Sequence, residues 1–395
     1  MMATNNWAKV YLNKDFAGIL EEQPGGRCCF TYDESFLKNN PQAISINLPI
    51  SKAEHIFENG LHPFFDNLVA EGWLAEIQAK ALSINPSNRF NLLMAFGHDL
   101  VGAVSVIDPN PQYQITIDRN NYLKEVSIKS KASMSGVQPK IFVREREGKF
   151  HPAQLDEYST HIAKLPGKYP LIIENEYLCT LAAKILLAPD PVVDLKIGVV
   201  EGIGEALLVK RFDRSTTGGK IHFEELSQLL NMKAINKYDG DYSDLADFIN
   251  SSPICSKVEL EKLFRRILVC ILLGNTDAHL KNFAMYHTPR GLELTPSYDM
   301  VFAAYYDLDE LALGLGKNIN TSLGAIKPKH LKILCDNFRL NQKVLELAIA
   351  SFATRLEKVY EAIDQQKHMH AGLRSKLIKQ VKSRWNGTFK NIGSK

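Results

Sequence analysis

Three polar residues in the second half of the chain have the types and spacing that phosphoryl transfer needs. Asp277 and Asn282 lie five residues apart after a strongly apolar segment, and Asp299 follows seventeen residues after Asn282. Moving a phosphoryl group requires a residue that orients the attacking hydroxyl and a metal ion held by carboxylate and amide oxygens. The sequence therefore predicts that Asp277 acts as the base and that Asn282 and Asp299 bind Mg²⁺.

The spacing of Asp277 and Asn282 is that of catalytic loops in protein kinases, where one loop presents the base to the substrate and an amide oxygen to the metal. A single Asp in such a segment is usually a turn residue or a helix cap. Three such residues in a fixed order, with apolar sequence between them, favour the catalytic interpretation. A metal-dependent hydrolase with Asp277, His279 and Asp299 as ligands is an alternative, but it leaves Asn282 without a role.

A lysine in the first half of the chain could contact the phosphates. Lys164 is an isolated cation in the apolar segment 161–166, where burial without an anionic partner would be costly. A nucleotide phosphate would provide that partner. Glu174 and Glu176 begin the next predicted helix, and one of them could also pair with this lysine, with Glu176 favoured.

Residues 133–140 precede a predicted strand and could surround phosphate groups with backbone N–H groups, assisted by Lys140. The segment contains one glycine and matches neither the Walker pattern nor G-x-G-x-x-G. A surface turn is therefore the alternative interpretation.

The elements that must position these residues divide the chain into three parts. Residues 1–108 are predicted as a small α+β unit, residues 109–214 as mainly β, and residues 215–395 as mainly helical, with a Pro/Asn cluster at 108–111 as the first boundary. A β-rich lobe followed by a helical lobe is the element order of a kinase. The predicted fold class is α+β, a bilobal protein-kinase-like fold with a β-rich N-lobe and a helical C-lobe, preceded by a small N-terminal α+β subdomain.

Hydrophobic periodicity and turn residues predict the individual elements. Ser256 and Glu259 have capping-box spacing at the start of one predicted helix, and a short hairpin is expected between residues 283 and 295. Strands are predicted at residues 8–12, 43–48, 141–143, 161–164, 192–200 and 206–211, with a turn at 201–204. Helices are predicted at residues 63–82, 88–96, 171–187, 224–230, 257–273, 329–337 and 342–363.

The composition is that of a globular protein. Of 395 residues, 45% are hydrophobic and 23% charged, which argues against disordered and fibrous classes. The longest apolar run is too short to span a bilayer, so we expect no membrane partner and a cytoplasmic location. The six cysteines have no C-x-x-C spacing, and we expect free thiols rather than a zinc site.

The net charge of +3 is small, but it is unevenly distributed. Residues 365–395 contain eight Lys or Arg and no Asp or Glu. A solvated helix face is the usual explanation for such a segment, and contact with DNA phosphates is the alternative.

Taken together, these segments resemble the HipA family, the kinase components of bacterial type II toxin–antitoxin systems. The resemblance extends over nearly the whole chain, and residues 275–282 are its most specific part. The similar segments are 45–50, 67–72, 97–102, 135–140, 161–166, 174–176, 209–214, 275–283 and 296–299.

The resemblance implies an ATP- and Mg²⁺-dependent serine/threonine protein kinase with Asp277 as catalytic base and with Asn282 and Asp299 as metal ligands. Lys164 would bind the phosphates, and residues 210–212 would form the hinge against adenine. The implied nucleotide-binding residues are Ser135, Gly136, Val137, Gln138, Pro139, Lys140, Lys164, Lys210, Arg211, Phe212, His279, Lys281, Asn282, Tyr298 and Asp299.

The resemblance also implies autophosphorylation at Ser133, or at Ser135 in the same Ser-Met-Ser arrangement. The implied partners are a small helix-turn-helix antitoxin (HipB-like), operator DNA through the antitoxin complex, and an aminoacyl-tRNA synthetase as protein substrate. A small-molecule or lipid kinase shares the D-x-x-x-x-N geometry. From another class, the chain could be a catalytically silent ATP-binding scaffold that binds an antitoxin and operator DNA.

Overall fold

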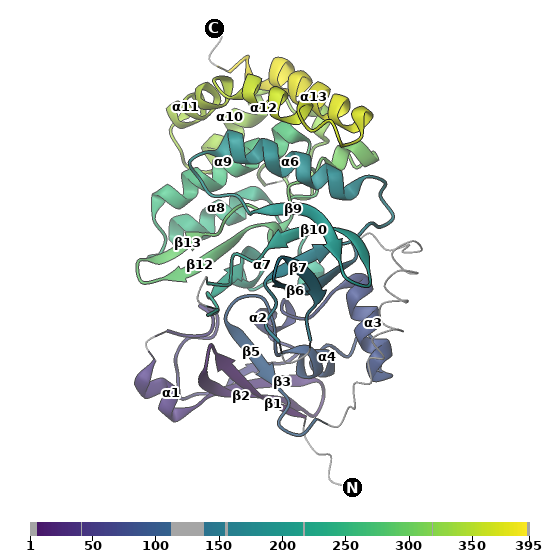
Figure 1. Ribbon diagram of the computed structural model, residues 1–395. Helices are drawn as coiled ribbons and strands as arrows, with labels where there is room; N and C mark the ends of the chain where they lie inside the picture. Colours follow the sequence, from purple (N-terminus) through teal and green to yellow (C-terminus); the bar gives the residue numbers. More distant parts are fainter. Residues whose placement is uncertain are drawn as a thin grey trace. The chain divides into compact units, whose positions relative to one another are not determined.

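The computed structural model describes residues 6–40, 42–111, 138–154, 157–215, 218–317 and 319–392. The chain forms two compact units, unit 1 (Met1–Lys168 and Gly198–Asn236) and unit 2 (Tyr169–Ile197 and Lys237–Lys395). Figure 1 labels their helices and strands. The chain therefore passes from one unit to the other three times. The second and third predicted ranges, 109–214 and 215–395, each contribute residues to both units.

The first part of unit 1 is a five-stranded antiparallel sheet in the order β4-β3-β2-β1-β5. Alternate residues of β1, Ala8, Val10 and Leu12, are buried in the hydrophobic core of this sheet, as the period of two in a half-buried strand requires. The strands are β1 (Trp7–Leu12), β2 (Asp15–Gln23), β3 (Arg27–Tyr32), β4 (His55–Phe57) and β5 (Val104–Ile107).

The strand predicted at residues 43–48 is wrong. Ser45 and Leu48 form only an isolated bridge, and β2 and β3 supply the strands instead. The Ser45 hydroxyl donates to the Glu224 carboxylate at 2.6 Å. These contacts within unit 1 hold the segment in an irregular conformation, because they satisfy its buried polar groups without a ladder.

The helix predicted at residues 63–82 forms as two helices. The Asn67 side chain donates to the Pro63 carbonyl at 2.8 Å at the end of α2, and α3 begins at Gly72, whose φ is +54°. The next helix begins after Asn88, as predicted, because this side chain accepts the N–H of Asn91 at 3.2 Å. The helices here are α1 (Glu34–Asn39), α2 (Pro63–Asp66), α3 (Gly72–Leu82) and α4 (Arg89–Phe96).

The second part of unit 1 is a closed barrel of strands in the order β10-β8-β6-β7-β9. Its core contains Val143, Ala163 and Leu208 together with Trp73 and Ile77 of α3. The barrel strands are β6 (Lys140–Arg146), β7 (Lys149–Pro152), β8 (His161–Lys164), β9 (Leu195–Val200) and β10 (Gly204–Lys210). Unit 1 also contains β11 (Phe223–Glu225), α7 (Leu226–Leu229) and η1 (Ala234–Asn236).

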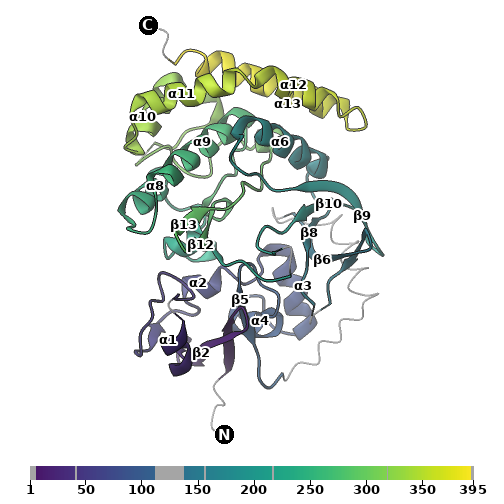
Figure 2. The same ribbon diagram turned by 60° about the vertical axis from the view of Figure 1, so that its left-hand side comes forward.

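Unit 2 is mainly helical, and its two long central helices, α6 (Ile172–Leu187) and α9 (Lys257–Leu273), pack against each other. Helices α12 and α13 lie side by side (Figure 2). The other helices are α8 (Tyr242–Ser251), α10 (Pro328–Asn337), α11 (Gln342–Ala353), α12 (Leu356–Asp364) and α13 (Ala371–Arg384). The short elements are β12 (Ala284–Thr288), β13 (Gly291–Leu294), η2 (Leu280–Asn282), η3 (Ala303–Tyr306), η4 (Leu323–Ala325) and a π-helix at Trp385–Phe389.

Helix α9 begins after Ser256 as predicted, but the capping box does not form. The Ser256 side chain makes no capping hydrogen bond. The Glu259 carboxylate instead accepts the N–H of Leu294 and the ammonium of Lys262, each at 2.7 Å. The glutamate thus joins the first turn of α9 to the end of β13.

The end of α6 is fixed from α9. The Arg265 guanidinium donates to Asp190 at 3.1 Å and to the carbonyl of Leu187 at 3.3 Å. The last carbonyl groups of a helix have no partner within the helix, and a cation is favoured there. Arg265 therefore stabilises this helix terminus by both effects.

All six cysteines are free thiols, as expected. Within the described ranges, no helix combines the length and the apolar character that crossing a membrane requires.

Candidate active site

The candidate catalytic loop follows directly from the end of α9. Gly274 ends this helix with φ +79°, a conformation that suits glycine. The next residue, Asn275, donates through its side chain to the Asp299 carbonyl at 3.2 Å. This contact joins the catalytic loop to the segment that carries the second carboxylate.

The two predicted metal ligands lie together. The Asn282 amide nitrogen donates to the Asp299 carboxylate at 3.0 Å, and the Asn282 amide oxygen accepts the N–H of His279 at 2.9 Å. A carbonyl-type oxygen has a second lone pair, so this oxygen keeps acceptor capacity. Mg²⁺ prefers such oxygen donors, and the pair fits a magnesium ion in its chemistry.

Asp299 has a positive φ of 58°. This left-handed conformation is uncommon for residues other than glycine, although Asp and Asn adopt it more readily than most. The hydrogen bonds from Asn275 and Asn282 to the two ends of this residue hold it there.

Asp277 reaches solvent and also contacts a residue that precedes it by 39 positions. The Tyr238 hydroxyl donates to Asp277 Oδ1 at 3.1 Å. Two effects raise the pKa of Asp277, first the burial of its carboxyl and then the negative charge of nearby Asp299. The hydrogen bond from Tyr238 and the positive charge of Lys237 lower it, but by less. The pKa of Asp277 lies above its usual range as a result.

Other predicted residues of unit 2 pack around the same loop. The Tyr298 hydroxyl donates to the Lys281 carbonyl at 2.7 Å, and the His279 ring meets the Tyr238 ring edge to face at 5.1 Å. These contacts shape the catalytic loop. Contact of His279, Lys281 and Tyr298 with nucleotide stays a prediction.

The predicted phosphate-binding residues of unit 1 lie at one end of two barrel strands. Lys140 of β6 and Lys164 of β8 are directly opposite each other in the strand register. Like charges in such a pair repel each other, and an anionic ligand would relieve that repulsion. The Gln138 side chain donates to the Leu165 carbonyl at 3.1 Å, and the Pro139 carbonyl accepts the N–H of Leu165 at 2.8 Å. Ser133, Ser135, Gly136 and Val137 lie outside the described residues.

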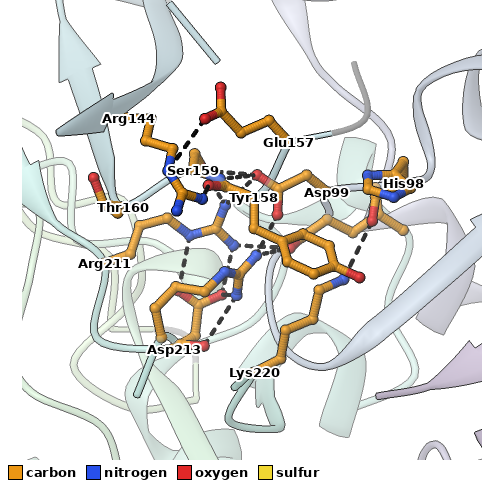
Figure 3. A network of polar contacts seen from close by, with 12 residues as sticks. His98, Asp99, Arg144, Glu157, Tyr158, Ser159, Thr160, Arg211, Asp213 and Lys220 are labelled. Carbon is orange, nitrogen blue, oxygen red and sulfur yellow. Dashed lines mark hydrogen bonds and ion pairs between the residues drawn. The ribbon is translucent and has the colours of Figure 1, made fainter. Parts of the chain in front are cut away.

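The side chain of Arg211 does not suit the predicted contact with nucleotide. Its guanidinium is buried in a polar network of unit 1 (Figure 3). It donates twice to Asp213, and also to Asp99, the Ser159 hydroxyl and the Leu100 carbonyl. All five of its side-chain donors are therefore engaged. The Arg211 backbone N–H also donates, to the Thr160 carbonyl at 3.0 Å, so only the Arg211 carbonyl is left for a hinge.

The other two hinge residues have different surroundings. Lys210, at the end of β10, is exposed and pairs with His161 in the strand register. The Phe212 ring packs against the Phe223 ring at 5.0 Å. Their contact with adenine stays a prediction.

The two glutamates at the start of α6 differ in their surroundings. The Glu174 carboxylate accepts the N–H of His370 at 2.6 Å. Glu174 therefore has a structural partner within unit 2. Glu176 is buried. The pairing of Glu176 with Lys164 stays a prediction.

The basic segment near the C-terminus is not uniformly available for DNA. The Arg374 side chain is buried and donates to the Asp364 carboxylate at 2.9 Å, and Arg384 donates to the Leu323 carbonyl. Lys376, Lys379 and Lys382 are exposed on α13. A phosphate-binding role is therefore limited to these three lysines among the central residues of the segment.

Two family models match most of the chain. The HipA N-terminal domain matches residues 8–107, and the HipA-like C-terminal domain matches residues 132–366. The chain belongs to the HipA family. The family resemblance predicted from the sequence is confirmed.

Relatives of this HipA-family chain include named kinases. The chain is 28% identical to Y4dM of Sinorhizobium fredii, over 85% of this chain and 87% of that protein. The name of Y4dM describes it as a kinase. It is 26% identical to the serine/threonine-protein kinase toxin HipA of Shewanella oneidensis, over 75% of this chain and 76% of the toxin. The kinase assignment is therefore supported at the level of the HipA family.

The fold is also that of a solved HipA structure. A chain from the complex of HipA, HipB and operator DNA of Shewanella oneidensis superimposes with a TM-score of 0.78 at 22% identity, over 98% of this chain and 99% of that chain. The predicted mixed α+β, protein-kinase-like fold is confirmed.

Sequence reasoning missed two residues of this HipA-family site. Tyr238 lies far from Asp277 in the sequence, and nothing in its surroundings marks it as a neighbour of the base. Asn275 was part of the recognised motif, and its position directly after a helix-ending glycine was the available signal.

Proposed function

We propose that this chain is an ATP- and Mg²⁺-dependent serine/threonine protein kinase. The observation that carries the proposal is the assembly of the three predicted residues in unit 2. Asn282 and Asp299 share a hydrogen bond of 3.0 Å, and Asp277 reaches solvent at the start of the same loop. Membership of the HipA family supports the same reaction.

In the proposed reaction, the substrate hydroxyl oxygen attacks the γ-phosphorus of ATP and gives its proton to the Asp277 carboxylate. The bond between the γ-phosphorus and the β–γ bridging oxygen breaks, and ADP leaves with that electron pair. Mg²⁺ held by Asn282 and Asp299 would neutralise charge on the phosphates. The Asn275 side chain keeps Asp299 in place by donating to the backbone carbonyl of Asp299.

Unit 1 would bind the nucleotide. Lys140 and Lys164 are opposite each other at the ends of their strands, and their ammonium groups suit the phosphates. Gln138 and Pro139 fix the start of β6 to the chain after β8. Residues 210–212 would lie against adenine, with the Arg211 side chain serving as a structural anchor rather than a ligand.

The proposed biological role is that of the toxin in a toxin–antitoxin system. Its partners would be a small HipB-like helix-turn-helix antitoxin, operator DNA bound through that antitoxin, and an aminoacyl-tRNA synthetase as the phosphorylated protein. The solved relative in a complex with HipB and operator DNA supports the first two partners. We also propose autophosphorylation at Ser133 or Ser135.

The first prediction tests the catalytic residues. Asp277→Asn and Asp299→Asn should each lower phosphoryl transfer by roughly 10²-fold or more, because each removes a charge at a proton-accepting or metal-binding position with little change in volume. Incorporation of label from γ-labelled ATP with Mg²⁺, into the chain itself and into an aminoacyl-tRNA synthetase, provides the measurement.

Asp307→Asn is the matched control, since Asp307 is exposed and Asn tolerates its left-handed conformation. It should keep full activity. Undiminished transfer in either the Asp277 or the Asp299 variant would remove that residue from the mechanism, and no transfer by wild-type protein would favour the silent scaffold.

A further inference from the structure

The catalytic loop is tied to the backbone of Lys237 and to the side chain of the next residue, Tyr238. The carbonyl of the preceding residue, Lys237, accepts the N–H of Leu280 at 3.1 Å. The Tyr238 ring packs edge to face on His279 at 5.1 Å, and the Lys237 ammonium lies 5.5 Å from the centre of the same ring. These contacts direct the phenol hydroxyl toward Asp277, 3.1 Å from Oδ1.

This hydrogen bond uses one oxygen of a carboxylate that has two. A carboxylate accepts hydrogen bonds at both oxygens. Among the residues that the structure describes, the Tyr238 hydroxyl is the one group that donates to the Asp277 side chain. Oδ2 therefore stays available, and the bond at Oδ1 fixes the direction in which Oδ2 points.

We infer that Tyr238 is a positioning residue for phosphoryl transfer, which holds Asp277 through Oδ1 so that Oδ2 accepts the proton of the substrate hydroxyl. The inference rests on the proposed function, because it needs Asp277 to be the base. Tyr238 itself touches neither the substrate nor the nucleotide. It acts in the catalytic step by orientation, and it leaves ATP binding unchanged.

The surroundings of Asp277 give this orientation a purpose. Besides Tyr238, the groups of the described ranges that act on its carboxyl are Asp299, which repels it, and Lys237, which attracts it. A carboxylate at the edge of the solvent rotates freely unless a donor fixes it, and a small misplacement of a catalytic group reduces the rate of a positioned reaction.

The test compares single hydroxyl deletions in the full chain. Tyr238→Phe keeps the ring contacts with His279 and removes the hydrogen bond. The probe is γ-labelled ATP with Mg²⁺, and the measurements are the maximal rate of label transfer to the chain and the ATP concentration that gives half of it. Tyr360→Phe is the control, because it removes the hydroxyl of a different tyrosine of unit 2, on α12, which is partly buried.

The expected result is a maximal rate about 10-fold lower in Tyr238→Phe, which corresponds to the loss of one hydrogen bond in the transition state. The half-saturating ATP concentration should stay within about 2-fold of wild type. The melting temperature should also be unchanged, and Tyr360→Phe should behave as wild type.

Two outcomes would overturn the inference while leaving the kinase proposal intact. One is a wild-type maximal rate in Tyr238→Phe when Asp277→Asn is inactive. The other is a fall in rate that is matched by weaker ATP binding or by a lower melting temperature, since this indicates a general structural role. Full activity in Asp277→Asn is distinguishable from both and would instead contradict the proposed base.

Discussion

Arg211 carries a full positive charge, although only 3% of the residue is exposed to solvent. Removing a guanidinium from water costs several kcal/mol by order of magnitude, unless its donors find acceptors and its charge finds a counter-charge. The carboxylates of Asp213 and Asp99 supply the negative counter-charge, and the Ser159 hydroxyl and the Leu100 carbonyl complete the set of acceptors. The stability of unit 1 therefore depends on each member of this network.

This dependence gives a prediction about Asp213. Asp213→Ala leaves the buried Arg211 charge without its main partner, and we expect a loss of about 3–5 kcal/mol in the free energy of unfolding. Asp247→Ala is the matched control, because the Arg339–Asp247 pair is exposed at 68% and 43% and such pairs contribute about 1 kcal/mol or less. Urea unfolding measures both, and equal losses would contradict the buried-charge argument.

The same network predicts a dependence on pH. Burial alone would raise the pKa of Asp99 and Asp213, but the guanidinium groups of Arg211 and Arg214 outweigh burial and hold the pKa of both carboxyls below its usual range. A group whose pKa is lower in the folded state contributes stability above its unfolded pKa and loses it as the pH falls toward the folded one.

The stability of unit 1 should therefore fall below about pH 4, where these carboxyls are protonated in the unfolded chain. Asp99→Asn should be less stable than wild type at pH 7 and should lose less further stability between pH 5 and pH 3. Urea unfolding across this range gives the comparison. Parallel curves for the two proteins would show that Asp99 contributes nothing to the acid response.

The difference between Asp277 and Arg211 shows which residues a sequence can assign. Asp277 and Asn282 sit on one loop, so their relation depends on local spacing, and that spacing was readable. Arg211 has its main partner, Asp213, two residues away, but its burial is completed by Asp99 and Ser159, which are 112 and 52 residues away, and its place in a hinge-like motif gave no sign of this. Tyr238 was missed for the same reason, since only the tertiary fold brings it to Asp277.

Among the elements, breaks inside long apolar segments were harder to predict than the helices themselves. Helix α9 was predicted with the same bounds, Lys257–Leu273, because a long apolar period and a terminal glycine agree. The helix predicted at 342–363 forms as α11 and α12, separated by Thr354 and Arg355. Its apolar period continues across the break, so the pattern carried no signal of it.

The junction between α9 and the catalytic loop depends on Gly274. Its φ is +79°, and a Cβ atom there would lie 2.9 Å from a ring carbon of Phe302. Gly274→Ala should cost more than about 1 kcal/mol in the free energy of unfolding, and it should also lower phosphoryl transfer because the loop with Asp277 begins at this residue.

Gly324→Ala is the control for this element, since that glycine has neither a positive φ nor a neighbour within 4 Å of the added carbon. It should be near neutral in stability and activity. Thermal unfolding and label transfer measure both variants. A Gly274 variant as stable as wild type would show that the end of α9 adjusts without cost.

At the scale of the whole molecule, the positive charge of the basic segment 365–395 lies largely on α13. Lys376, Lys379 and Lys382 are exposed there, although Lys376 and Lys382 also lie over the rings of Tyr305 and Tyr360. Arg374 and Arg384 are engaged within unit 2, so they are unsuited to a role at the surface.

If these three lysines contact DNA phosphates in an antitoxin complex, replacing them with Gln should flatten the dependence of DNA affinity on salt by roughly one phosphate contact per lysine. Titration of operator DNA at several salt concentrations measures the slope. The same triple change at exposed Lys329, Lys332 and Lys358 is the control. Equal slopes for the two triple variants would return α13 to the role of a solvated face.

The three passages of the chain between its units also matter while the protein is being made. Synthesis on the ribosome proceeds from the N-terminus, so α6 emerges before α9 and α12, the helices of unit 2 against which it packs. Unit 1 has all of its sequence once Asn236 has emerged, whereas α6 must wait with its apolar residues uncovered. A nascent chain stalled at that point would expose an unpartnered apolar helix, which makes it a natural client for a chaperone.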